Sequence, residues 1–325
     1  MQHSVVAGLF VCVSLLLIAC DHRSNEDEVI QVKVRSAEAS PTALSSTLDS
    51  ESSDEIHVDK PVLHWAKPGL APLFIDEGED LERGVGDHMF VQIQELLPQY
   101  YHVNLRLNYP RLLEELRKGS NVCAILHHTP EREKYMAYSQ AVIVNPSYDL
   151  YVSAKGLKHF KDATGWSGNA TSFDALMARS EGLKLAITPG QSYGAERDAI
   201  LKRHGDKAEV IRSFADHQAL VKVLAANRVD MVLGFPWVMN YHLEKLDSHS
   251  DLVKVPLNDV KQYEASYIAC AETALGREVV SSINAISPSV HDRAKSFLPR
   301  WLTAKESQLY YGIYHDYFYD GKALP

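Results

Sequence analysis

The sequence predicts an α/β protein built as two lobes, each a mostly parallel sheet flanked by helices. Short apolar strands alternate with amphipathic helices between residues 61 and 128, and the alternation starts again between residues 183 and 235. A further strand and helix at 265–286 have no obvious place in the second cycle. Regular alternation favours parallel strands with right-handed crossovers, and two cycles in one chain favour two lobes.

The first cycle holds three predicted strands and two predicted helices. Phe90, Ile93 and Leu97 fall on one face of its first helix, and Gly119 follows the second, as is common at helix ends. The predicted elements are a strand at 61–66, a helix at 87–97, a strand at 102–109, a helix at 110–119 and a strand at 121–128.

The second cycle repeats this pattern after residue 182. The predicted elements are strands at 183–190, 208–214 and 229–235, with helices at 195–205 and 215–228 between them. We detect no internal repeat of fixed period in the chain.

The first twenty residues predict an exported lipoprotein. Residues 5–19 are uncharged, apolar and too few to span a bilayer of about 30 Å, so 1–19 is interpreted as a signal peptide that is removed. The sequence at 17–20 resembles the lipobox of bacterial lipoproteins, which implies that Cys20 becomes the lipidated first residue. Asp21 resembles the signal that retains lipoproteins in the inner membrane. The alternative is a buried apolar helix.

Residues 20–59 are predicted to be a disordered tether. The stretch 21–59 carries ten Asp or Glu, three Lys or Arg and eight Ser, without any Phe, Tyr or Trp, so it cannot bury enough apolar area to offset its ordering entropy. The fold is expected to begin near Lys60. A net charge of −9 argues against nucleic acid as a partner.

Cysteine usage predicts a disulfide. Signal cleavage removes Cys12 and acylation uses Cys20, which leaves Cys123 and Cys270 in an oxidising compartment. The alternative is two buried free thiols.

A Cys123–Cys270 bond would return the last strand to the first lobe. Lobe 1 is therefore expected to be discontinuous, at 60–148 and 265–325, with lobe 2 at 149–264. Two crossing segments, near 148–153 and 257–264, would then form a hinge.

Arg132 occupies an unusual position. Thr129 and Pro130 indicate a helix start, which places Arg132 in the first turn, where the positive end of the helix dipole disfavours a cation unless an anion is bound there. The alternative is a surface ion pair with Glu131 or Glu133.

Several motifs together resemble the family 3 extracellular solute-binding proteins, which have the type II periplasmic binding protein fold. The resemblance covers roughly residues 60–300 and is strongest in LLEELRKGSNVCAILHHTPEREKYMAYSQA, at 112–141. Weaker matches are APLF at 71–74, GVGDHMFVQIQELL at 84–97, PGQSYG at 189–194 and LAANRVDMVLG at 224–234. The Trp in LHWA and the cysteine pair resemble an uncharacterised branch of this family.

The resemblance implies a carboxylate clamp. The arginine of the Thr-x-x-Arg motif, here Arg132 after Thr129, is implied to bind the carboxylate of the solute, and His127 is implied to offer a polar contact. The loop of Gly190, Gln191 and Ser192 is implied to close over the same carboxylate, so that two helix amino ends converge on one anion. The alternative for His127 is a hydrogen-bonded histidine at the end of a strand. The alternative for the loop is a plain turn between a strand and a helix.

One departure concerns the solute's ammonium group. Amino-acid binders of the family carry an aspartate at the position of Phe235, so an ordinary amino acid would lose a charge-assisted contact of about 1.5 to 3 kcal/mol. Phe235 and Trp237, with Trp65 and Phe74 from lobe 1, could instead form aromatic walls around the solute. Packing in the core is the alternative for each.

The leading functional hypothesis is a monomeric, membrane-tethered periplasmic protein that captures a small anionic or zwitterionic solute by lobe closure, for a transporter permease or a sensor. It would use no cofactor and no metal, and would not be an enzyme. A dehydratase-like enzyme acting on a cyclic carboxylate is the alternative, with His127, His128 or Glu264 as acid or base. Metal capture by the fifteen histidines is a third possibility, which their scattered spacing disfavours.

Overall fold

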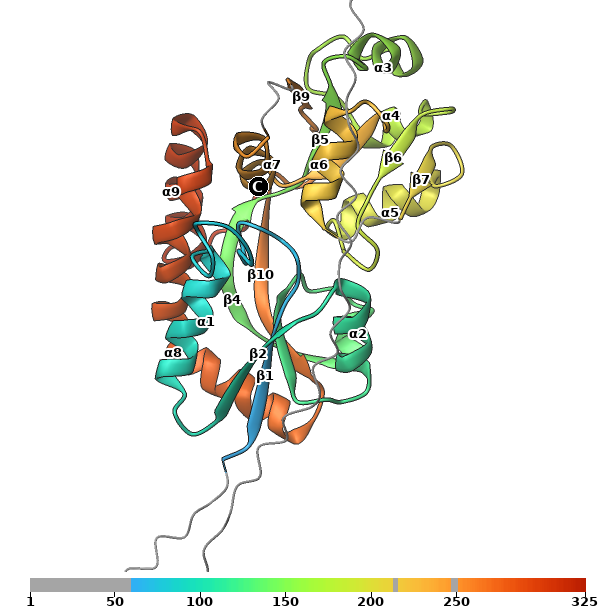
Figure 1. The fold of residues 1–325 in the computed structure, drawn as a ribbon. Coiled ribbons are helices and arrows are strands. Elements are labelled where there is room, and N and C mark those ends of the chain that lie inside the picture. Colours follow the sequence, from blue (N-terminus) through green and yellow to red (C-terminus); the bar gives the residue numbers. More distant parts are fainter. Residues whose placement is uncertain (1–59, 213–215, 247–250) are drawn as a thin grey trace, which may run out of the picture. The chain divides into compact units, whose positions relative to one another are not determined.

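The structure is a computed structural model that describes residues 60–212, 216–246 and 251–325. The predicted signal peptide, Cys20 and the tether lie outside the described residues. Two five-stranded sheets with flanking helices make up the described part of the chain (Figure 1). The predicted two-lobed α/β fold is confirmed.

The first sheet has the strand order β2-β1-β3-β10-β4. The bounds are β1 Val62–Lys67, β2 Tyr101–Arg106, β3 Val122–Leu126, β4 Met136–Pro146 and β10 Tyr263–Ala271. Strand β1 is parallel to β2 and β3, whereas β10 is antiparallel to β3 and β4. The sheet is therefore mixed, because the strand that returns from the second lobe runs against its neighbours.

Helices cover both faces of this sheet. They are α1 Val85–Leu96, α2 Tyr109–Arg117 and α8 Ala274–Phe297. Side chains alternate along β3: Ala124 and Leu126 pack in the cluster that holds the leucines of α2, whereas Cys123 and Ile125 pack in the cluster that holds α1 and α8. Cys123 lies directly opposite Cys270 on β10, and the two form the predicted disulfide.

The second sheet has the order β7-β6-β8-β5-β9. The strands are β5 Asp149–Ser153, β6 Lys184–Ala186, β7 Glu209–Ile211, β8 Met231–Gly234 and β9 Leu252–Val255. The helices are α3 Leu157–Thr164, α4 Phe173–Ala178, α5 Ala195–His204, α6 His217–Ala225 and α7 Pro236–Glu244. Strands β6, β7 and β8 are parallel, and β5 is antiparallel to both β8 and β9.

The chain passes between the sheets twice. It leaves the first sheet after Pro146 and enters β5 at Asp149, and it leaves β9 at Val255 and enters β10 at Tyr263. These crossings lie side by side, because Tyr263 pairs with Pro146 and the Ser147 amide donates to the Gln262 carbonyl at 2.8 Å. The 3₁₀ helix η2 Leu298–Trp301 and the helix α9 Ala304–Phe318 follow α8. No helix of the described residues is long and apolar enough to cross a membrane.

The helix predicted to begin at Thr129 is absent from the structure. Only a single 3₁₀ turn, η1 Arg132–Lys134, follows β3, and the 11-residue strand β4 begins two residues later at Met136. Thr129 still organises the turn, because its carbonyl accepts from the Arg132 amide at 3.0 Å. The prediction of a helix amino end in the first lobe was wrong, since the turn is too short to carry a helix dipole.

Candidate functional site

A narrow cavity lies between the two sheets. Its volume is about 30 Å³, which is room for about two water molecules. Its walls come from both lobes: Leu70, Leu73, Tyr109, Ile125, Leu126, His127, Arg132, Ile143, Asn145, Tyr148, Gln191, Ser192, Phe235, Trp237, Ser266 and Leu298.

Arg132 links the two lobes at this cavity. Its Nη1 donates to the His127 carbonyl at 3.1 Å, and its Nη2 donates to the Gly190 carbonyl, 58 residues further along the chain, at 2.9 Å. Gly190 has a φ of 75°, and a Cβ built on it would lie 3.3 Å from the Leu113 side chain on α2. The loop of the second lobe therefore approaches the first lobe closely where Arg132 bridges them.

Arg132 is buried without a carboxylate partner. Only 6% of it is exposed, and among the described residues its guanidinium pairs with no Asp or Glu. Arg197 on α5 is the contrasting case: it is also buried, but it lies 3.7 Å from Glu264 Oε1 and donates to the Lys261 carbonyl at 2.8 Å. A buried cation without a counter-ion is costly, so Arg132 is the unusual member of the pair.

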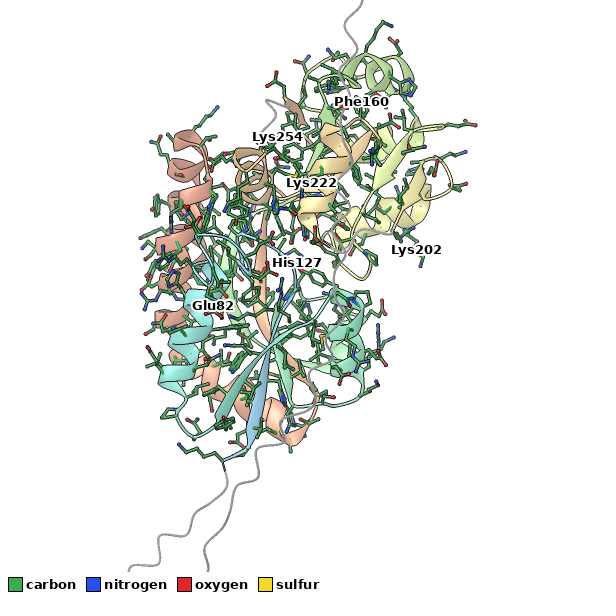
Figure 2. The ribbon with its side chains drawn as sticks, viewed as in Figure 1. Glu82, His127, Phe160, Lys202, Lys222 and Lys254 are labelled. Carbon is green, nitrogen blue, oxygen red and sulfur yellow. A yellow bond between two sulfur atoms is a disulfide. The ribbon has the colours of Figure 1, made fainter. Side chains whose placement is uncertain are left out.

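His127 follows β3 at the cavity (Figure 2). Burial, together with the charges of Arg132 and Arg197, lowers the pKa of His127 to about 3. The ring is therefore neutral at physiological pH. Three shielded polar atoms of the cavity residues lack a partner among the described residues, namely His127 Nδ1, Gln191 Oε1 and Trp237 Nε1. A water molecule or a bound solute can satisfy such atoms.

Aromatic rings form one wall of the cavity. Tyr148 stacks on Phe235 with ring centroids 3.7 Å apart, and Trp237 lies 5.5 Å from Phe235 on the same wall. Gln191 Nε2 donates to the Tyr148 hydroxyl at 2.6 Å. Phe235 and Trp237 thus lie at the cavity, as the sequence suggested.

Helix α5 begins after the Gly190–Ser192 loop, and no side chain caps its first turn. Its N-cap is Gly194, and the Asp198 side chain already accepts from the Ser192 hydroxyl at 2.6 Å and from the Tyr193 amide at 2.9 Å. Ser192 lines the cavity but does not cap the helix through the amides of the first turn. The expected convergence of two helix amino ends is wrong in the first lobe, where no helix follows Thr129, whereas α5 does begin beside Gln191 and Ser192 of the lining.

Trp65 and Phe74 lie in the core of the first lobe, where the alternative interpretation placed them. Both rings lie 5.0 Å from the ring of Phe90 on α1, and Trp65 Nε1 donates to His102 Nδ1 at 2.9 Å. Neither residue lines the cavity, because β1 is covered on both faces and its side chains are used for packing. Thr129 is also outside the lining and acts by holding the Arg132 backbone.

The sequence did not identify four polar residues at the cavity, namely Tyr109, Asn145, Tyr148 and Ser266. Asn145 interrupts the apolar run of β4, and Ser266 interrupts that of β10, so each left a weak signal. Tyr109 begins α2 and Tyr148 lies in the first crossing, where periodicity gives no information.

The three residues considered for catalysis do not meet in the structure. His128 pairs with Glu133 at 2.7 Å in an exposed position, and Glu264 contacts Arg197 and Ser147. Only His127 lines the cavity.

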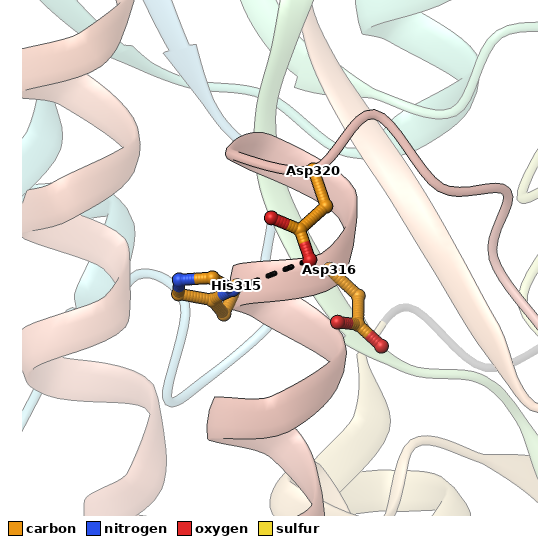
Figure 3. A group of neighbouring side chains, drawn as sticks. All are labelled: His315, Asp316 and Asp320. Atoms are coloured by element: carbon orange, nitrogen blue, oxygen red, sulfur yellow. Dashed lines mark ion pairs between the residues drawn. The ribbon is translucent and has the colours of Figure 1, made fainter.

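One group of potential metal ligands occurs in the described part of the chain, at His315, Asp316 and Asp320 near the end of α9 (Figure 3). The Lys322 ammonium lies 2.7 Å from Asp316 Oδ1 and 3.0 Å from Asp320 Oδ2, so a protein cation already neutralises these carboxylates. The group carries no functional assignment.

Comparison with known proteins supports the fold. No protein-family model matches the chain, and no curated protein matches it in sequence. Among solved structures, the chain is similar to AbpA of Streptococcus pneumoniae, an amino acid ABC transporter substrate-binding protein bound to L-arginine. The two are 15% identical, with a TM-score of 0.57 over 76% of this chain and 96% of that one.

Two further structures are similar. The periplasmic VFT2 domain of BvgS from Bordetella pertussis is 17% identical, with a TM-score of 0.55 over 75% of this chain and 94% of the domain. A mutant of ArgBP from T. maritima is 17% identical, with a TM-score of 0.56 over 76% of this chain and 97% of that one. This chain therefore has the two-lobed α/β fold that periplasmic binding proteins use.

Proposed function

We propose that this protein is an extracytoplasmic solute-binding protein that captures a small carboxylate-bearing solute between its lobes. The observation that carries the proposal is Arg132, a buried guanidinium that faces the inter-lobe cavity with no carboxylate among the described residues to neutralise it. A planar guanidinium binds a carboxylate through two parallel hydrogen bonds, which makes it suited to this task.

Capture requires the lobes to move. The cavity has room for about two water molecules, so even a small organic acid enters only after the lobes separate or the lining side chains shift. Two crossing segments that lie side by side are a suitable hinge. Closure would then bring the Gly190 loop and the aromatic wall of Tyr148, Phe235 and Trp237 onto a solute held by Arg132.

The similar structures support this class of function and leave two kinds of partner. AbpA is described as part of an amino acid ABC transporter, whereas BvgS contributes a periplasmic domain. For this chain we propose a permease or a sensor in the inner membrane as the partner. The chain would act as a monomer in the periplasm, held by a lipid on Cys20 and by the tether at 20–59, after removal of the signal at 1–19. Lobe 1 would comprise 60–148 and 265–325, with lobe 2 at 149–264.

Ligand-dependent stabilisation of the full chain tests the proposal. A panel of small carboxylates and the matching primary amides is screened by thermal unfolding, and hits are titrated by calorimetry. The carboxylates should stabilise the chain and the amides should not. Arg132→Met should weaken binding about 5- to 30-fold, because a carboxylate that replaces the Gly190 carbonyl on Arg132 gains about 1 to 2 kcal/mol.

Arg203→Met is the matched control, because Arg203 is more than half exposed and is not among the residues that line the cavity. Its affinity should equal that of the parent. Equal affinity of the parent and Arg132→Met, with both variants folded, would exclude the carboxylate clamp. Turnover of the bound compound would indicate an enzyme instead.

A further inference from the structure

The charges around the cavity bear on which carboxylates the site accepts. Among the described lining residues, Arg132 is the only one with a formal charge. The site can therefore neutralise an anion but offers no carboxylate to an ammonium group. An amino acid would bring a cation for which these walls have no partner.

Three acidic residues around the lining are already engaged, and Asp149, which follows Tyr148, lies 3.3 Å from the Lys254 ammonium. Asp198 accepts from the Ser192 hydroxyl and the Tyr193 amide, at 2.6 and 2.9 Å. Glu264 lies 3.7 Å from Arg197 and accepts from Ser147 at 3.4 Å. Neither lines the cavity. If Asp198 bound a solute, it would lose its contacts with the residues that precede α5. If Glu264 did so, it would lose its contacts with Arg197 and with Ser147 in the first crossing.

The electrostatic environment is also positive. His127 is held neutral by burial and then by two guanidinium groups, those of Arg132 and Arg197. An ammonium group at the same place would be disfavoured by the same three effects, because burial and like charges both oppose a cation.

The aromatic wall does not provide an open cage for a cation. Phe235 is covered by Tyr148 at 3.7 Å and has Trp237 at 5.5 Å, so its ring is used in packing. Trp237 also lines the cavity; the residue is 2% exposed, and its Nε1 has no partner among the described residues. An indole N–H is a donor only, so its natural partner is an oxygen of the solute.

Building on the proposed function, we propose that the solute is a monocarboxylate with an uncharged oxygen on its second carbon, a 2-oxo or 2-hydroxy acid, and not an amino acid. Arg132 binds the carboxylate and Trp237 Nε1 donates to the oxygen on carbon 2. The apolar residues of the lining, among them Leu73, Ile125 and Ile143, contact the remainder of the solute.

Matched pairs that differ only at carbon 2 test the inference on the full chain by calorimetry. Suitable pairs are leucine and 4-methyl-2-oxopentanoate, phenylalanine and phenylpyruvate, and alanine and pyruvate, each with its 2-hydroxy acid. The oxygen-bearing acid should bind at least about tenfold more tightly than the amino acid. An amino acid that binds equally or more tightly overturns the inference and leaves the carboxylate clamp in place. Failure of every compound to bind overturns both.

Trp237→Phe separates hydrogen bonding from packing. The variant keeps an aromatic ring and loses the N–H, so affinity for 4-methyl-2-oxopentanoate should fall about three- to tenfold. Affinity for 4-methylpentanoate, which lacks the oxygen, should fall by a smaller factor, because this acid loses only the packing of the larger ring. Equal losses for both acids would show that Trp237 only packs against the solute and would overturn its assigned role. The thermal midpoint of the free variant checks that it is folded.

Discussion

Two buried histidines at the start of α6 and in α7 should make the protein sensitive to acid. His217 and His242 are 2% and 6% exposed, and Nε2 of each has no partner among the described residues. Burial lowers the pKa of His217 to about 4 and the pKa of His242 to about 3. Asp216 opposes both shifts, whereas the charges of His217, Lys222 and Lys245 add to the shift of His242.

The size of the effect follows from proton linkage. The unfolded chain binds a proton at each histidine near pH 6.5, whereas the folded chain does so only near pH 4 and pH 3. The full contribution to the free energy of unfolding is therefore present above pH 6.5 and is lost as the pH falls toward 4. At pH 5.0 each histidine should lower the free energy of unfolding by about 2 kcal/mol, and the two together by about 4 kcal/mol. This is a large part of the free energy of unfolding of a typical protein, which is about 5 to 15 kcal/mol.

Urea unfolding at pH 8.0 and pH 5.0, followed by tryptophan fluorescence, measures this loss. For each variant, the free energy of unfolding at pH 5.0 is subtracted from that at pH 8.0. This difference does not contain the pH-independent effect of the substitution. The double variant His217→Leu and His242→Leu should lose about 4 kcal/mol less than the parent between these pH values. His159→Leu, at an exposed position of α3, is the control and should behave as the parent. If the free energy of unfolding of the double variant fell between pH 8.0 and pH 5.0 by as much as that of the parent, the reasoning would be refuted.

Two further predictions concern single contacts. Asp87 is buried and accepts from Lys67 Nζ at 2.9 Å, so Asp87→Ala should lower the free energy of unfolding by about 3 to 5 kcal/mol in urea unfolding, and replacing both partners by apolar residues should recover part of the loss. A Cβ on Gly194 would lie 2.4 Å from Glu264 Oε1, whereas one on Gly168, which also has a positive φ, would meet nothing within 4 Å. Gly194→Ala should therefore cost about 1 to 3 kcal/mol more than Gly168→Ala, and equal costs would contradict the predicted clash.

Periodicity explains which parts of the fold could be predicted from the sequence. Strand β3 and helix α2 have clear apolar patterns, and both were expected near their observed bounds. Helix α7 was missed because it is buried on nearly all sides, including at Pro236, Trp237 and Val238, so it has no polar face to reveal a period of 3.6 residues. The mixed direction of the sheets was also missed, since direction depends on where the two crossings return the chain.

The sequence singled out Arg132 but did not predict the local structure that positions it. Arg132 was identified from its motif, and it lies at the inter-lobe cavity, although the helix that was expected to position it is a single 3₁₀ turn. Trp65 could not be separated from Trp237 by sequence, because both are aromatic residues beside strands. Only the packing distinguishes them: Trp65 donates to His102 inside the first lobe, whereas Trp237 lines the cavity and its Nε1 has no partner among the described residues.

The bond between Arg132 and the Gly190 carbonyl limits how much of the binding energy the clamp can supply. A solute carboxylate would compete with a backbone carbonyl that already occupies one side of the guanidinium. Charge-assisted bonds are roughly twice as strong as neutral ones, so the exchange would favour the carboxylate by about 1 to 2 kcal/mol. That is about one decade in affinity, and the rest must come from apolar and aromatic contacts made on closure. The clamp would therefore select for a carboxylate, whereas the walls around it would set how tightly the solute is held.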